Sequence, residues 1–174
     1  MPTATYEAIS TTTVPSNITT LSITGISQAY TDLRIIMVPK GTTGANAMRM
    51  RVNNDSGSNY NVCFWSATPS NTSNGARDIN TDQICVGNYT NMAAALGRTI
   101  YIIDLYAYTS ANLFKRISIK SATAVNSVVD QTDALWKNSS TAVNRLDFNI
   151  APFGSSTGDF MPGTTVSIYG IKAY

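Results

Sequence analysis

Strict alternation of apolar and polar residues is the feature that most constrains the fold of this chain. In the segment Met48-Arg49-Met50-Arg51-Val52, methionine or valine alternates with arginine. Successive side chains of a β-strand point to opposite faces of the sheet, so the pattern predicts a strand with one face on a core and the other in water. Similar patterns predict strands at 33–38, 99–108, 116–120, 145–150 and 165–171, and less regular ones at 6–9, 18–23, 61–65, 83–86 and 127–135.

Clusters of turn-forming residues separate these segments. Residues 53–59 read NNDSGSN, and Gly and Asn accept the positive φ angles that tight turns need, so we expect a hairpin turn there. The polar stretch 66–80 is expected to be a long exposed loop, and 91–96 one or two turns of helix. Many short strands between such turns predict an all-β protein, an antiparallel β-sandwich of the jelly-roll-like kind, with residues 1–174 in a single domain.

The alternation also assigns side chains to the interior of this sandwich. The expected core residues are Leu33, Ile35, Met48, Met50, Val52, Ile117, Ile119, Leu146, Phe148, Val166 and Ile168.

Charge and composition limit the classes of partner. Charged residues make up only 13% of the chain and the net charge is +2, with the Lys and Arg scattered along the sequence. A phosphate backbone calls for a clustered basic surface, so nucleic acid is not expected as a partner. Neither a bilayer-spanning apolar run nor a secretory signal is found, so we expect no membrane partner and a protein made and kept in a cytoplasm, at least until assembly.

The residues needed for common enzyme chemistry are scarce. The chain has no histidine, which removes the usual general base and zinc ligand, and Glu7 is the only glutamate. No glycine-rich phosphate loop is present, so we expect no catalytic residues, no cofactor and no metal. The turn at 53–59 superficially resembles a calcium loop but holds a single carboxylate. Cys63 and Cys85 are expected to be free thiols, with a disulfide as the alternative.

Aromatic residues point to a core or an interface rather than to a sugar-binding platform. The residues concerned are Trp65, Trp136, Tyr60, Tyr89, Tyr101, Tyr106 and Tyr108. The strand at 99–108 is apolar at successive positions and is interrupted by Asp104, which we expect on a strand face beside a Lys or Arg. Because both faces of this strand look apolar, a homo-oligomer is predicted, most simply a homotrimer, with Tyr101, Leu105, Tyr106 and Tyr108 near the contact.

Four segments carry a resemblance to a known family. They read YEAISTTT at 6–13, YTDL at 30–33, RVNNDSGSNY at 51–60 and FMPGTTVSIYGIK at 160–172. Together they resemble the small β-rich virion structural proteins of tailed phages, of the type common in cyanobacterial phages, which read Y-x-x-I, Y-T-D-L, R-F-N-G-D-T-G-x-N-Y and G-S-x-F-x-L-Y-G-I. Asn54 stands where the family usually has glycine, and Asn also tolerates left-handed backbone.

The resemblance implies a component of a virus particle, located in the virion and in contact with other virion proteins of the capsid or tail. Within that class we expect a capsid decoration or cement protein that binds the phage shell. The alternative is a tail or fibre receptor-binding module, which would present loops such as 66–80 and bind host surface glycans through Trp and Tyr.

Overall fold

The chain folds into two packed antiparallel sheets. The structure is a computed structural model that describes residues 5–42, 48–67, 73–86, 99–123, 128–150 and 158–172. The strands of the eight-stranded sheet are, in spatial order, β1 (Tyr6–Thr13), β12 (Thr165–Ile171), β3 (Asp32–Val38), β8 (Thr99–Tyr106), β9 (Lys115–Thr123), β10 (Val128–Trp136), β5 (Tyr60–Ala67) and β6 (Ser73–Thr81). Those of the four-stranded sheet are β2 (Thr20–Thr24), β11 (Arg145–Asn149), β4 (Met48–Val52) and β7 (Ile84–Val86).

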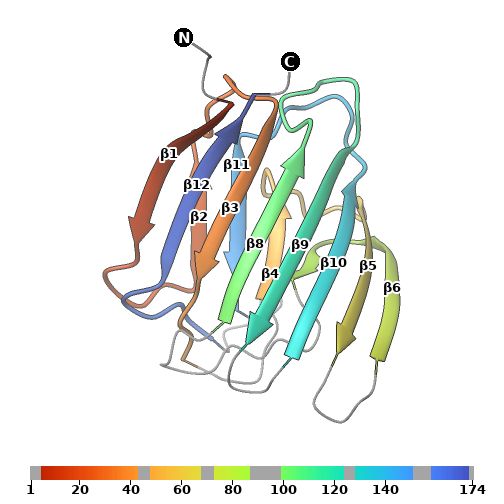
Figure 1. Cartoon of the computed structure of the whole chain (residues 1–174). Coiled ribbons are helices and arrows are strands. Elements are labelled where there is room, and N and C mark those ends of the chain that lie inside the picture. The colour runs from red at the N-terminus through yellow and green to blue at the C-terminus, as the bar shows by residue number, and fades with distance from the viewer. Residues whose placement is uncertain are drawn as a thin grey trace.

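The smaller sheet lies behind the larger one and covers one of its faces (Figure 1). The prediction of an antiparallel β-sandwich is therefore confirmed, while its jelly-roll character stays a prediction. The other face of the eight-stranded sheet has no layer of secondary structure over it among the described residues (Figure 1).

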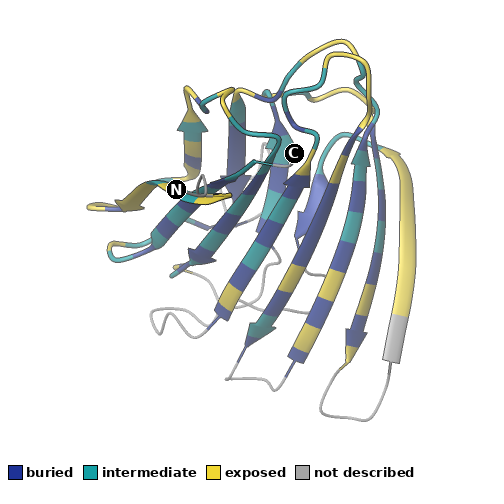
Figure 2. Ribbon diagram, turned by 45° about the horizontal axis from the view of Figure 1, so that its top comes forward, coloured by how far each residue is buried: buried dark blue, intermediate teal, exposed yellow. Residues whose placement is uncertain are grey.

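The core lies between the sheets and follows the alternation of the strands. Each of the eleven side chains that the sequence assigns to the interior is buried, which confirms that prediction. On β8, for example, Tyr101, Ile103 and Leu105 have no exposed surface, and buried and less buried positions alternate along the neighbouring strands (Figure 2). Removal of these apolar surfaces from water is the main stabilising contribution to such a sandwich.

The turn at 53–59 does not close a hairpin. It connects β4 of the smaller sheet to β5 of the larger one, so it forms a corner between the sheets. Asn53 and Asn54 have φ angles of 51° and 55°, and the amide of Asp55 donates to the carbonyl of Val52 (2.9 Å). The left-handed turn expected of these asparagines is present, but the two strands that it joins pair with other strands instead of with each other.

The Asp55 side chain holds this corner against the larger sheet. Its carboxylate accepts hydrogen bonds from the indole of Trp136 (2.7 Å), the amide of Gly57 (2.8 Å) and the side chain of Asn59 (2.9 Å). Partial burial raises the pKa of Asp55, but these hydrogen bonds act more strongly together and the net pKa lies below its usual value. The carboxylate is thus a structural hydrogen-bond acceptor.

The expected long loop at 66–80 is wrong, because β5 continues to Ala67 and β6 begins at Ser73 and runs to Thr81. Strand β6 forms an exposed edge of the sheet and lacks apolar alternation, which explains why its sequence looks like a loop. The helix expected at 91–96 lies outside the described residues. Within the described part of the chain, no helix has the length and apolarity needed to cross a membrane.

Candidate docking surface

Three of the four expected interface residues belong to the core instead. Tyr101, Leu105 and Tyr108 have no exposed surface, so they pack inside the chain. Only Tyr106, which is 40% exposed, lies on the surface. The physical reason is the two-residue period of β8, which places Tyr101 and Leu105 on the opposite face from Asp104.

The outer face of the larger sheet carries an exposed apolar area near one end of its strands. One cross-strand row runs from Ile100 through Ala122 and Val129 to Ala67. We define the apolar patch as Ile100, Ile102, Ala122, Val129, Ala67 and Trp65. Val129 is 60% exposed and Trp65 50% exposed, so large apolar side chains are open to water together on this face.

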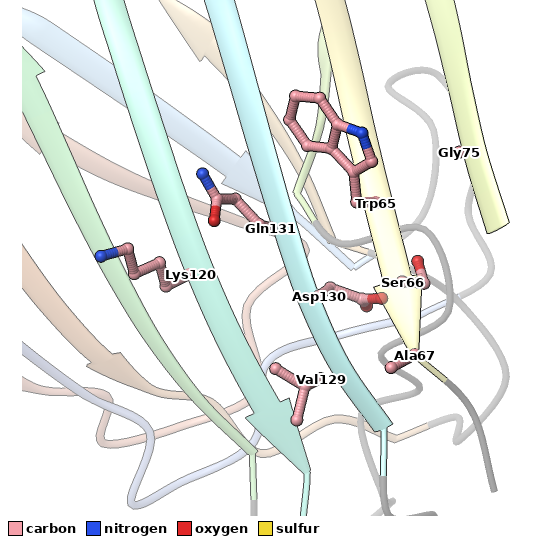
Figure 3. A pocket seen from close by; sticks show the side chains of 8 residues that line it. All are labelled: Trp65, Ser66, Ala67, Gly75, Lys120, Val129, Asp130 and Gln131. Atoms are coloured by element: carbon pink, nitrogen blue, oxygen red, sulfur yellow. The ribbon is translucent and has the colours of Figure 1, made fainter. Parts of the chain in front are cut away.

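A shallow hollow forms beside Trp65 within this patch. It has a volume of about 450 Å³ and is lined by residues of β9, β10, β5 and β6. The outward side chains of Lys120, Gln131 and Trp65 follow one another across β9, β10 and β5, and Gly75 of β6 ends the row without a side chain (Figure 3). Lys120 and Val129 also line a neighbouring hollow of about 170 Å³ over β8 and β9.

The opposite half of the same face is charged and internally paired. We define the charged patch as Arg34, Asp104, Tyr106, Arg116 and Asp133. Arg34 donates two hydrogen bonds to Asp104, at 2.7 and 2.9 Å, which confirms the expectation that Asp104 pairs with a Lys or Arg. Arg116 lies 3.5 Å from Asp133, and its guanidinium is 5.5 Å from the centre of the Tyr106 ring.

The two patches differ in how their charges are compensated. The hydrogen bonds from Arg34 to Asp104 raise the pKa of the arginine above its usual value, so its guanidinium stays charged and paired with this carboxylate. Lys120, by contrast, lines the hollow in the apolar patch and makes no ion pair or hydrogen bond with the part of the chain that the structure describes. An uncompensated cation therefore stands at the border of an apolar surface.

The structure brings together no aromatic platform from the residues named in the sequence. Trp136, Tyr60, Tyr101 and Tyr108 are buried, while Tyr89 lies outside the described residues. The exposed rings of Trp65 on β5 and Tyr106 on β8 are separated by the intervening strands β9 and β10.

Chemically reactive groups are sparse in the described ranges. No cluster of three or more His, Cys, Asp or Glu residues that could hold a metal ion occurs in them. Cys63 and Cys85 are both free thiols, as expected, and burial raises the pKa of the Cys85 thiol.

The residues of the apolar patch were only partly detectable in the sequence. Asp104 marks the outward face of β8, and the two-residue period then places Ile100 and Ile102 on that same face. The signal for Val129 is weak, because the inward positions of β10 include the buried polar residues Asp130 and Thr132. The sequence around Lys120 does not identify it as part of a binding surface, since its position beside Trp65 depends on how the neighbouring strands pair.

No family model matches the chain, and no curated protein matches its sequence. Among solved structures, the chain is similar to exo-inulinase from Aspergillus awamori, with a TM-score of 0.28, 9% identity and coverage of 97% of this chain, which spans only 29% of the length of the inulinase. It is also similar to arcelin-5, a lectin-like defense protein from Phaseolus vulgaris, with a TM-score of 0.18, 11% identity and coverage of 84% of this chain and 75% of arcelin-5. At these TM-scores neither likeness carries an argument about function.

Proposed function

We propose that this chain is a non-enzymatic virion structural protein of a tailed phage, and that it decorates the capsid by binding the shell. The family resemblance of the segments at 6–13, 30–33, 51–60 and 160–172 supports a particle component. The sandwich supports a compact subunit that binds through a broad face.

The observation that carries the proposal is the apolar patch. Isolated exposed apolar residues are normal on soluble proteins, but a contiguous group on one sheet face is typical of an interaction site. Ile100, Val129 and Trp65 are each at least 43% exposed and lie on strands β8, β10 and β5 of the same outer face. Contact with another protein would remove these side chains from water.

The alternative role as a glycan-binding fibre module has less support. It relied on a long loop at 66–80 and on grouped Trp and Tyr side chains. Most of that loop is β-strand, and the tyrosines that would accompany Trp65 are buried or lie elsewhere. Capsid decoration is therefore the better proposal.

Self-association as a homotrimer is part of this proposal. The two edges of the larger sheet are formed by β1 and β6, which contain no lysine or proline to discourage pairing with another strand. Contacts between copies through such edges would leave the apolar patch of each copy facing the shell. Light scattering on the purified chain measures the oligomeric state, and a monodisperse monomer would contradict this part of the proposal.

Deletion of the gene from the phage tests the function. We expect particles without the chain to assemble but to release DNA at a lower temperature, because cement proteins stabilise a shell that is already formed. Washed wild-type particles should contain the chain by mass spectrometry. Absence from those particles would refute the proposal, and loss of adsorption to the host with unchanged shell stability would favour the receptor-binding role.

A further inference from the structure

The hollow beside Trp65 combines apolar walls with a single cation, and this combination restricts the chemistry of its partner. Val129 and Trp65 are largely exposed, and Lys120 lies two strands away from Trp65 in the same cross-strand row. Neighbouring strands are about 4.8 Å apart, so the Cα atoms of Lys120 and Trp65 are separated by roughly 10 Å. One short stretch of a partner can therefore contact both side chains.

Charge compensation argues for a carboxylate in that partner. Covering Lys120 with apolar atoms alone would remove a charge from water without a counter-charge, which is costly. No described residue of this chain pairs with it.

A second copy of the chain does not supply this carboxylate through the same face. The outward carboxylates of β8 and β10 are Asp104 and Asp133. Both already bind arginines of their own sheet, Arg34 and Arg116. Packing two outer faces together would bring Lys120 no free acidic group from these strands, which favours a different protein as the partner.

The polar groups of the hollow are too few for an acidic sugar. A bound sugar buries several hydroxyl groups, each of which needs a hydrogen-bond partner. The side-chain amide of Gln131 already donates to Asp133 (3.1 Å), and the polar lining residues Ser66 and Asp130 are buried. The exposed walls are therefore mainly apolar, with Val129, Ala67 and the Trp65 ring. An apolar side chain fits these walls better than a hydroxylated ring.

From these constraints we infer that the apolar patch docks a segment of another virion protein in which a large apolar side chain lies next to an Asp or Glu. The apolar side chain occupies the hollow between Trp65 and Val129, and the carboxylate pairs with Lys120. The inference rests on the proposed function, which makes the partner a component of the phage particle.

Binding of the purified full-length chain to phage particles that lack it tests this inference. We expect Trp65→Ala to weaken binding about 30-fold, as for a central aromatic residue of an interface. The matched control is Phe114→Ala, because Phe114 is 49% exposed and lies on the connection between β8 and β9, at the opposite end of β8 from Ile100. A second pair of variants compares Val129→Asp in the patch with Leu113→Asp outside it. The side chains of Val129 and Leu113 are similarly exposed, at 60% and 57%.

The charge is tested separately. Lys120→Glu should weaken binding about tenfold, whereas Lys137→Glu, the same charge reversal beyond the end of β10, should leave it within about twofold of wild type. Circular dichroism and thermal unfolding of each variant establish that it is folded. Equal binding by patch and control variants would overturn the inference while leaving the proposed function intact.

A carbodiimide, which joins an amine to a neighbouring carboxylate without a spacer, identifies the partner. On bound particles we expect Lys120 to be cross-linked to an Asp or Glu of a different virion protein. A cross-link to a second copy of this chain, or none at Lys120, would overturn the inference. Failure of the wild-type chain to bind the particles at all would overturn the proposed function and this inference with it.

Discussion

The apolar patch and the charged patch lie on the same face and share strands β8, β9 and β10, yet their side chains are satisfied in different ways. Asp104 and Asp133 of the charged patch find arginines on neighbouring strands, so that half is complete within the chain. Ile100 and Val129 remain exposed, and Lys120 has no acidic partner in the described residues. The difference indicates that the charged patch contributes to the sheet itself, whereas the apolar patch is completed by something outside the chain.

The two tryptophans should give the largest contrast in stability. Trp136 is 1% exposed and donates its indole N–H to Asp55, so Trp136→Ala should lower the free energy of unfolding by about 3–5 kcal/mol. Trp65 belongs to the apolar patch and is half exposed, so Trp65→Ala should cost about 1 kcal/mol or less. Urea unfolding of both variants measures the contrast. Equal losses would mean that Trp65 is part of the core and not of an open surface.

Removal of a paired charge and removal of an unpaired charge should also differ in their effect on the free energy of unfolding. Asp104→Asn removes the counter-charge of Arg34, and since the Arg34 side chain is 40% exposed we expect a loss of about 1 kcal/mol in the free energy of unfolding, reduced in high salt. Lys120→Gln should change it by less than about 0.5 kcal/mol, because no described partner is lost. A clear loss of stability in Lys120→Gln would show that the lysine is compensated within the chain.

A further expected effect concerns the core directly beneath the apolar patch. Burial raises the pKa of Tyr101 well above that of an exposed phenol, so the unfolded chain releases this proton first and stability falls as pH rises above about 10. Between about pH 9.5 and pH 10.5, the free energy of unfolding should therefore fall by about 0.7 kcal/mol less in Tyr101→Phe than in wild type. Urea unfolding at these two pH values gives the difference. The same pH dependence in variant and wild type would place Tyr101 in water or at an interface.

Much of the fold could be predicted from the sequence because alternation is a local property. The positions of β3, β4 and β12, and the burial of residues such as Met48 and Phe148, follow directly from which residues alternate. Strand β6 could not be predicted, since its positions 75–80 are all exposed and no face of it needs to be apolar. Its existence depends on pairing with β5, which is a tertiary interaction.

The candidate site shows the same limit more sharply. The asparagines at 53 and 54 predict a left-handed turn correctly, but the sequence around them does not indicate that β4 and β5 belong to different sheets. Similarly, Tyr101 and Leu105 look like interface residues until the smaller sheet is known to cover their face. The hollow at Trp65 is built from four strands that are distant in sequence, so it appears only when they are placed side by side.

A cryo-electron microscopy map of the phage particle at side-chain resolution tests the central claim most directly. We predict density for this chain on the capsid, with the apolar patch covered by a different virion protein, an apolar side chain beside Trp65 and a carboxylate at Lys120. A particle without this chain, or one in which the chain is present and Trp65, Val129 and Lys120 all face solvent, would contradict the account.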